Sequence, residues 1–237
     1  MELPPLTNGI IVKRYKRFLA DVELADGQLV TAHCPNTGSM LSCWRPGAPV
    51  QLSHSDNPKR KLAWTLERVD MGQGWVGVHT GRTNSIIREA LLGGHIPPLM
   101  GYEEIRSEVV FEAPGFERAR FDFLLGRGFE PDAWIEVKNV TLWDGERLRF
   151  PDAPTQRGRK HLELLAEARR LGRRGVMIYA LNRPEGECFS PADGIDPAYG
   201  ELLRRVVDQA GVELLAVRIA HRQQALEVAE MVSIDLG

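Results

Sequence analysis

The sequence has few cysteines and lacks any long apolar run. Three cysteines in 237 residues are an odd number without a Cys-x-x-Cys pair, which argues against a disulfide framework and against a zinc knuckle. No run of about 18 apolar residues occurs, and the start, MELPPLTNG, carries neither a charged leader nor an apolar stretch. We therefore expect no membrane span and no signal peptide, a cytoplasmic location, and reduced thiols at Cys34, Cys43 and Cys188.

The chain also lacks a charge excess of either sign. Lys and Arg number 30 and Asp and Glu number 32, so the formal net charge is −2. Any binding of nucleic acid is therefore expected to depend on local patches. Two short basic segments are candidates: KRYKR supplies Lys13, Arg14, Lys16 and Arg17, and KRK supplies Lys59, Arg60 and Lys61. Ordinary solvated loops are the alternative interpretation of both segments.

Residues 1–82 are predicted to form an OB-like β-barrel domain. Short segments with strand-like alternation follow one another, interrupted by Pro, Gly and Asn clusters. They are FLADVEL, QLVTAH, PVQLSH, LAWTLERV and WVGVHT. A small barrel with basic loops is a common platform for single-stranded nucleic acid, although many barrels have other roles.

Residues 83–237 are predicted to form an α/β domain, so the fold class is α+β with two domains. Apolar residues at helical spacing predict a helix over 83–92, which Gly93 and Gly94 end. The following pattern predicts strands at 105–111, 120–125 and 134–142, a helix at 155–171, a strand at 175–181, a helix at 197–210 and a strand at 212–219. This order is typical of a mixed sheet covered by helices.

The stretch RFDFLLGRGFEPDAWIEVKNVTL, residues 120–142, predicts two strands that pair about a turn at Phe129. In this register Asp122 lies opposite Glu136, and Arg120 lies opposite Lys138. Alternation along each strand then separates a polar face from an apolar face. The polar face holds Arg120, Asp122, Leu124, Trp134, Glu136 and Lys138, and the apolar face holds Phe121, Phe123, Leu125, Ile135 and Val137.

Two carboxylates opposite each other on a sheet repel unless a cation lies between them. Mg²⁺ or Mn²⁺ suits such a pair, with water and a substrate phosphate completing the shell. We predict that Asp122 and Glu136 are metal ligands and that, with Lys138, they form the catalytic group of a phosphodiesterase. Glu108 is a further candidate ligand, with an exposed strand glutamate as the alternative. Asp132 lies about 13 Å along the strand from Glu136, too far to share one ion.

A salt-bridged sheet face without metal is the alternative, with Arg120 reaching Glu136 and Asp122 reaching Lys138. The helix predicted over 155–171 favours the metal site, because its first turns are basic and would hold cations over the sheet. The predicted nucleic-acid contacts near the carboxylates are Arg120, Arg157, Lys160 and His161.

Three segments resemble, in order, the signature blocks of the sugar fermentation stimulation protein A family. They are HCPNTGSM (33–40), IEVKNVTL (135–142) and FPDAPTQRGRKHLELL (150–165). The resemblance covers most of the chain and implies an N-terminal OB-like domain, a C-terminal PD-(D/E)xK nuclease fold, and an association with DNA binding and regulation of bacterial sugar metabolism genes. It places the nuclease motif on Asp122, Glu136 and Lys138, with Phe121 where the motif has proline.

In the first of these segments, Asn36, Thr37 and Gly38 predict a tight loop with exposed backbone N–H groups. Contact with phosphate, docking of the two domains, and a plain turn are the three interpretations of this loop.

The sequence therefore predicts a DNA-binding protein of weak sequence specificity whose second domain carries a Mg²⁺-dependent nuclease site. Two alternatives remain: a non-catalytic regulator that uses the nuclease fold to hold DNA, and an RNA-processing nuclease.

Overall fold

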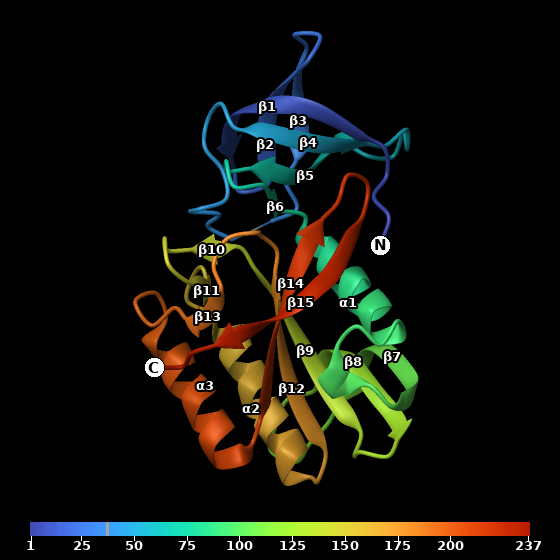
Figure 1. Cartoon of the computed structure of the whole chain (residues 1–237), viewed down its shortest axis with the longest axis vertical. Coiled ribbons are helices and arrows are strands. Elements are labelled where there is room, and N and C mark those ends of the chain that lie inside the picture. Colours follow the sequence, from blue (N-terminus) through green and yellow to red (C-terminus); the bar gives the residue numbers. More distant parts are fainter. Residues whose placement is uncertain (37) are drawn as a thin grey trace.

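The computed structural model describes residues 1–36 and 38–237, which form two domains stacked along the long axis of the molecule (Figure 1). An all-β domain lies at one end and a larger α/β domain at the other. The predicted loop residue Thr37 lies outside the described residues. Within the described part of the chain, no helix is both long and apolar enough to cross a membrane.

The first domain is a closed five-stranded barrel, which confirms the predicted OB-like fold. Its five strands are β1 (Leu6–Tyr15), β2 (Leu19–Leu24), β3 (Leu29–His33), β4 (Pro49–His54) and β5 (Trp64–Asp70), and the short β6 (Trp75–Gly77) pairs with β5 outside the closed ring. The order β3-β2-β1-β4-β5-β6 closes through an additional pairing of β3 with β5. Inward residues such as Ile11, Val22 and Leu66 are fully buried, and their burial supplies the driving force for closure.

Strand β1 corrects the prediction that KRYKR is a loop. Lys13 and Arg14 lie within β1, and only Lys16 and Arg17 belong to the turn before β2. The sequence did not predict this strand because exposed apolar residues, Ile10 and Val12, flank the buried Ile11, and only Gly9 and Ile11 are buried. A strand with so few buried positions shows little apolar alternation.

The second domain is a mixed sheet with helices, as predicted, but the sheet has nine strands where the sequence predicted five, and helices cover both of its faces. Its elements are η1 (Thr80–Arg82), α1 (Thr83–Leu92), η2 (Pro97–Leu99), β7 (Tyr102–Phe111), β8 (Ala119–Gly128), β9 (Ala133–Val140), β10 (Leu142–Trp143), β11 (Leu148–Phe150), α2 (Gln156–Arg170), β12 (Arg174–Leu181), β13 (Cys188–Pro191), α3 (Pro197–Ala210), β14 (Glu213–His221) and β15 (Leu226–Ile234). The strand order is β10-β11-β13-β15-β14-β12-β9-β8-β7, and β12 runs parallel to both β9 and β14.

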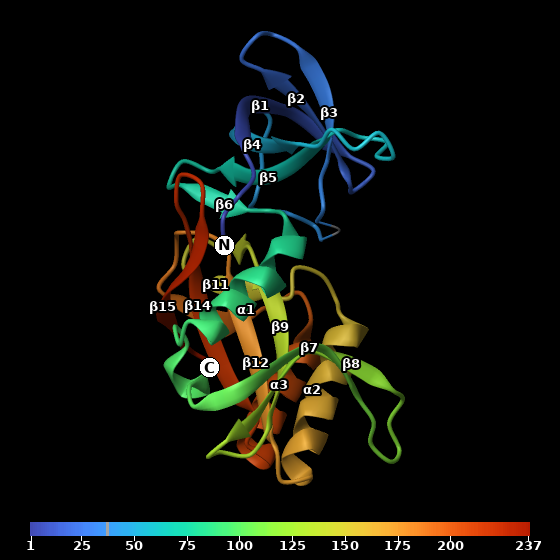
Figure 2. The same cartoon turned by 90° about the vertical axis from the view of Figure 1, so that its right-hand side faces the viewer.

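Two apolar cores lie on opposite faces of this sheet. Figure 2 shows α1 on one side of the sheet and α2 on the other. Helix α1 packs Ile86 and Ile87 against one face, and helices α2 and α3 pack Leu165 and Leu203 against the other. Helix α2 begins where the Thr155 side chain accepts a hydrogen bond from Gly158 N at 3.0 Å, which caps its first turn. Central strand β12 is buried on both faces and reads as an uninterrupted apolar run.

Contacts across the domain junction come from the N-terminal residues and from the segment between β3 and β4. Leu3 belongs to the core under α1, and the N-terminal amino group lies 2.6 Å from Glu89, so the first residues pack on the second domain although the predicted boundary at 82/83 assigned them to the first. Ser39 N donates to Asp152 at 2.9 Å. The buried Arg183 donates to Ser42 O at 3.2 Å and Thr141 O at 2.7 Å, which ties the barrel to the sheet.

Candidate active site

The predicted hairpin register is confirmed, but the strands part at the proposed site. Strands β8 and β9 pair Phe123 with Ile135 and Leu125 with Ala133, and the ladder ends there. Beyond it, the Asp122 side chain takes the place of a strand carbonyl, because its Oδ2 accepts from Val137 N at 2.7 Å. The prediction that Arg120 lies opposite Lys138 is wrong, since the two strands are no longer paired at that point.

The ladder on the other side of β8 is also interrupted at Asp122. Glu108 faces it on β7 with φ of +55°, in the left-handed region that residues other than glycine rarely adopt. Alternation therefore fails locally, and Phe121 packs in the core under α2 while Phe123 packs in the core under α1. This corrects the predicted assignment of both phenylalanines to one face. Glu108 itself is exposed, 3.6 Å from Arg120, and does not join the carboxylate cluster, so the alternative of an exposed strand glutamate holds.

Glu136 is the most constrained charge of the cluster. Its side chain is only 5% exposed, and its Oε1 accepts from Lys138 Nζ at 2.5 Å and from His161 Nδ1 on α2. Burial alone would raise the pKa of Glu136, but the hydrogen bond from His161 and the charge of Lys138 outweigh it and lower the pKa. The second oxygen, Oε2, is buried and has no hydrogen-bond partner among the described residues.

Asp122 is held beside this buried charge from two directions. Its Oδ1 accepts from Asn84 Nδ2 on α1 at 2.7 Å, and its Oδ2 accepts from Val137 N. Burial, followed by the charge of Glu136, raises the pKa of Asp122 to about 6, and the two hydrogen bonds oppose the shift without cancelling it. The negative charges of Asp122 and Glu136 thus repel each other in the protein without a bound cation.

The cluster opens into a polar pocket of about 290 Å³. Its lining comes from η1, the start of α1, β8, β9 and the first turn of α2: Thr80, Gly81, Thr83, Asn84, Asp122, Glu136, Val137, Lys138, Asn139 and Arg157. Within the described chain no group of three or more His, Cys, Asp or Glu residues is arranged to hold a metal. The protein thus offers a pair of carboxylates, and a hydrated Mg²⁺ or Mn²⁺ commonly binds through one or two, with water and phosphate as further ligands.

The predicted basic helix contributes unequally to this pocket. Arg157 is exposed and lines the pocket. Lys160 lies 2.6 Å from Glu117 on the surface, and His161 points inward to Glu136. His161 therefore positions the carboxylate and is not available as a surface contact for nucleic acid.

The basic residues of the barrel also divide into free and engaged groups. Arg14 donates through Nη2 to Asn36 O at 2.9 Å and Gly38 O at 3.1 Å, so it holds the loop before β4. Lys13 lies 3.2 Å from Asp21, and Arg60 donates to Thr65 at 2.7 Å. The side chains of Lys16, Arg17, Lys59 and Lys61 are exposed.

The HCPNTGSM segment docks the two domains, which is one of the three interpretations of its sequence. Ser39 contacts Asp152, Thr80 Oγ1 donates to Pro35 O at 2.7 Å, and Gly38 packs so closely on Asp152 that a Cβ atom there would lie 2.2 Å from a carboxylate oxygen. Only glycine permits this approach.

Thr80, Asn84 and Asn139 are pocket residues that the sequence did not predict. Asn139 follows Lys138 in the IEVKN segment, but an uncharged strand residue gives no signal of its own. Asn84 orients Asp122 from a helix distant in sequence, which only the fold reveals.

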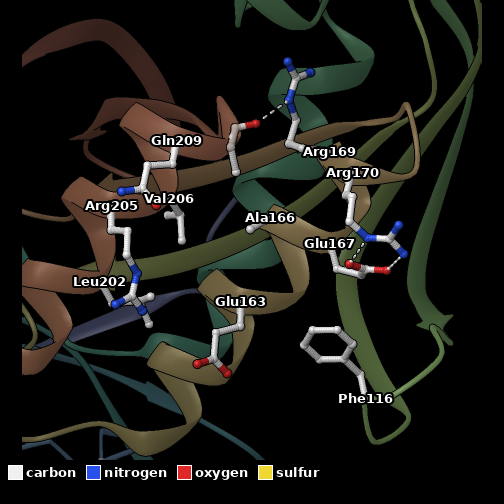
Figure 3. A pocket seen from close by; sticks show the side chains of 11 residues that line it. Phe116, Glu163, Ala166, Glu167, Arg169, Arg170, Leu202, Arg205, Val206 and Gln209 are labelled. Atoms are coloured by element: carbon white, nitrogen blue, oxygen red, sulfur yellow. Dashed lines mark hydrogen bonds and ion pairs between the residues drawn. The ribbon is translucent and has the colours of Figure 1, made fainter.

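A separate pocket of about 500 Å³ lies between α2 and α3, away from the carboxylates (Figure 3). Two groups of its charged lining residues are engaged: Glu167 accepts from Arg170 at 2.6 Å, and Arg169 donates to Ala210 O at 3.4 Å. Although this pocket is larger than the carboxylate pocket, it is the weaker candidate for an active site. None of its described lining residues has a buried polar atom without a hydrogen-bond partner.

Comparisons with known proteins agree with both domains. Two family models match the chain. The model of the Sugar fermentation stimulation protein RE domain matches residues 81–225, and the model of the SfsA N-terminal OB domain matches residues 12–78. Sugar fermentation stimulation protein homologs from Geobacter metallireducens and Syntrophotalea carbinolica are 52% and 53% identical over 100% and 92% of both chains. A structure of Pyrococcus furiosus SfsA in complex with Ca²⁺ has a TM-score of 0.86 at 24% identity, covering 99% of this chain and 98% of that one, and shows the shared fold.

The raised pKa of Asp122 predicts a pH-dependent effect of Asp122→Asn on stability. The native state binds this proton more tightly than the unfolded chain, whose reference pKa is 3.8, so wild-type stability falls as pH rises toward about 6. The stability of Asp122→Asn does not fall in this way, because the amide at position 122 does not ionise. The amide of Asn84 can turn so that its oxygen accepts from the new NH₂ group. Relative to wild type, the variant should gain on the order of 2 kcal/mol between about pH 4 and about pH 7.

Urea denaturation followed by circular dichroism, in the presence of a chelator, measures this difference. Asp132→Asn is the matched control, since Asp132 is an exposed turn residue of the same hairpin, and it should change stability by less than about 0.5 kcal/mol at either pH. A loss of stability at neutral pH in Asp122→Asn would instead show that its carboxylate is a stabilising partner of Lys138.

Proposed function

The chain belongs to the sugar fermentation stimulation protein family, and on that premise we propose that it binds nucleic acid and cleaves phosphodiesters with a divalent metal held by Asp122 and Glu136. The observation that supports this most is the Oε2 atom of Glu136, which is buried, ionised and without a partner in the described structure, beside a second carboxylate. A buried anionic oxygen left unpaired is unfavourable by several kcal/mol unless a cation satisfies it.

The residues present fit a hydrated divalent ion. Glu136 Oε2 and one oxygen of Asp122 would be the protein ligands, and the ion would relieve the repulsion that raises the pKa of Asp122. The related P. furiosus protein was solved in complex with Ca²⁺, which supports divalent metal binding in the family. Mg²⁺ and Mn²⁺ are our proposal for this chain. A bound ion of this kind supplies positive charge to the phosphate and a more acidic water.

The basic residues of the pocket have separate tasks in this proposal. Lys138 is fixed by its 2.5 Å contact with Glu136, and its other ammonium hydrogens can donate to a phosphate or to the attacking water. Arg157 lies at the pocket and offers a planar fork for phosphate oxygens. His161 keeps Glu136 oriented and ionised.

The barrel supplies the proposed binding surface. In OB-folds the loops between strands 1 and 2 and between strands 4 and 5 bind oligonucleotides. Here the first of these loops carries Lys16 and Arg17, and the second carries Lys59 and Lys61. Such contacts reach phosphates and not base edges, so we propose DNA as the substrate with weak sequence preference, and RNA as a second substrate to be tested.

A non-catalytic DNA-binding regulator is the second candidate function. It is favoured by the closed ion pair between Lys138 and Glu136, which balances the charge of Glu136 without a metal. In that case the link of the family to sugar metabolism would rest on DNA binding alone.

Metal binding is expected to depend on Asp122. In isothermal titration with Mn²⁺, Asp122→Asn should lower the affinity by more than about a hundredfold, since loss of residues outside the ligand set alone commonly lowers it 10–100-fold. Asp132→Asn, the control from the same hairpin, should bind as wild type does.

Lys138→Ala should bind Mn²⁺ at least as tightly as wild type, because a competing cation is removed, and should lose cleavage of labelled DNA.

Uptake of Mn²⁺ without cleavage of single-stranded DNA, duplex DNA or RNA would favour the regulator. Equal Mn²⁺ affinity of wild type and Asp122→Asn would contradict the proposed ligands.

DNA affinity is expected to fall steeply with salt. Changing Lys16, Arg17, Lys59 and Lys61 to Gln should flatten the slope of log affinity against log salt by about 0.7 for each single-strand phosphate that the variant no longer neutralises. Arg14 is left in place because it holds the loop at Asn36. Fluorescence anisotropy at several salt concentrations measures the slope, and Gln at the exposed Arg106 and Arg127 of β7 and β8 is the control. An unchanged slope in the barrel variant would remove these loops from the binding surface.

A further inference from the structure

A second pocket continues the carboxylate pocket toward the barrel. It has a volume of about 200 Å³, and the two pockets share Thr80 and Asn139 as a common wall. Its lining is contributed by both domains: Asn36, Gly38, Thr80, Asn139, Thr141, Leu142, Arg149, Phe150 and Asp152. A chain bound across the carboxylates would therefore enter the junction between the two domains on this side.

The amide of Asn139 is held in one orientation at this common wall. Its Oδ1 accepts from Thr83 Oγ1 at 3.0 Å and from Asn182 Nδ2 at 2.7 Å. The Oδ1 of Asn182 in turn lies 2.9 Å from His221 Nε2. Burial lowers the pKa of His221 to about 3, so the ring is neutral, and Nε2 is the donor of this contact because the amide oxygen of Asn182 can only accept. This chain of hydrogen bonds leaves Asn139 Nδ2 as a donor for the pockets.

The barrel side of the second pocket is fixed as well. Gly38 and Ser39 rest on Asp152, and the two hydrogen bonds from Ser39 N and Oγ occupy the carboxylate oxygen that faces them. Arg149 is anchored through Nε to Asp144 at 2.6 Å and adds positive charge to the lining. A space of about 200 Å³ is below the usual range of roughly 300–1,000 Å³ for small-molecule pockets, so it admits one phosphate–sugar unit but no base pair.

The free basic loops of the barrel end next to this pocket. Leu19, which follows the turn with Lys16 and Arg17, pairs with His33 at the end of β3, and His33 also pairs with Thr65 just after the loop with Lys59 and Lys61. From His33 the chain runs directly into the segment that lines the pocket at Asn36 and Gly38. Phosphates held by the two loops would thus lead toward the second pocket.

We propose that the second pocket binds the phosphate–sugar unit next to the scissile phosphate of a single-stranded nucleic acid, with Asn139 Nδ2 as the positioning donor. This inference rests on the proposed function and names its substrate class. Asn139 acts on the neighbouring unit and takes no part in the proposed metal binding.

The test compares Asn139→Asp with wild type in binding a fluorescein-labelled oligothymidylate and a labelled duplex of equal length, in the presence of Ca²⁺. The aspartate keeps both accepted hydrogen bonds and exchanges only the NH₂ donor for an oxygen that repels phosphate. We expect about tenfold weaker binding of the single strand, unchanged weak binding of the duplex, and Mn²⁺ affinity that is not reduced. Asn8→Asp, an exposed substitution on β1 that adds the same charge, should leave all three unchanged.

Equal loss of single-strand affinity in Asn139→Asp and Asn8→Asp would overturn the inference, as would wild-type protein that binds the duplex as tightly as the single strand. Wild-type protein that takes up Mn²⁺ and cleaves DNA, with an Asn139→Asp variant that binds normally, would refute this pocket and leave the proposed function intact. Absence of Mn²⁺ uptake by wild type would instead refute the proposed function.

Discussion

The burial of Glu136 is the constraint on which the rest of the site depends. A carboxylate inside a sheet must be paired, and here one oxygen is paired twice, by Lys138 from the same strand and by His161 from the helix that covers it. That arrangement fixes how α2 lies on β9. It also forces β8 away at Asp122, because the second carboxylate takes the Val137 N–H in place of a ladder carbonyl. The second oxygen of Glu136 remains for a cation.

The domain junction places the barrel next to the site that contains the buried Glu136. Arg183, only 1% exposed, binds Glu185 of its own domain and carbonyl groups at Ser42 and Thr141, so separating the domains would leave buried polar groups unpaired. The same junction brings residues 80–84 to the carboxylates and the loop at Gly38 to Asp152. Nucleic-acid binding by the barrel and chemistry in the second domain are thereby proposed to act on one continuous strand.

The sequence predicted the parts that follow from local pattern. The hairpin register came from the turn and from alternation; it holds as far as the pair Phe123 and Ile135, and Asp122 and Glu136 just beyond it line one pocket. The interruption at Asp122 was not predictable, because it depends on Asn84 from α1 and on the backbone of Glu108 in β7. Strands β1, β13 and β15 were also missed: β1 exposes apolar Ile10 and Val12 and so lacks a clear alternation, β13 is short, and β15 has few buried positions. His161 was predicted as a surface contact, and packing turned it inward.

Crystals soaked in Mn²⁺ and measured at the manganese absorption edge test the central claim most directly. The account predicts an anomalous-difference peak about 2.2 Å from both Glu136 Oε2 and an oxygen of Asp122, with Lys138 still in contact with Glu136 Oε1. A peak at other carboxylates, or no peak with the ion pair of Lys138 and Glu136 unchanged, would contradict it and leave the buried cluster as a structural element of a DNA-binding scaffold.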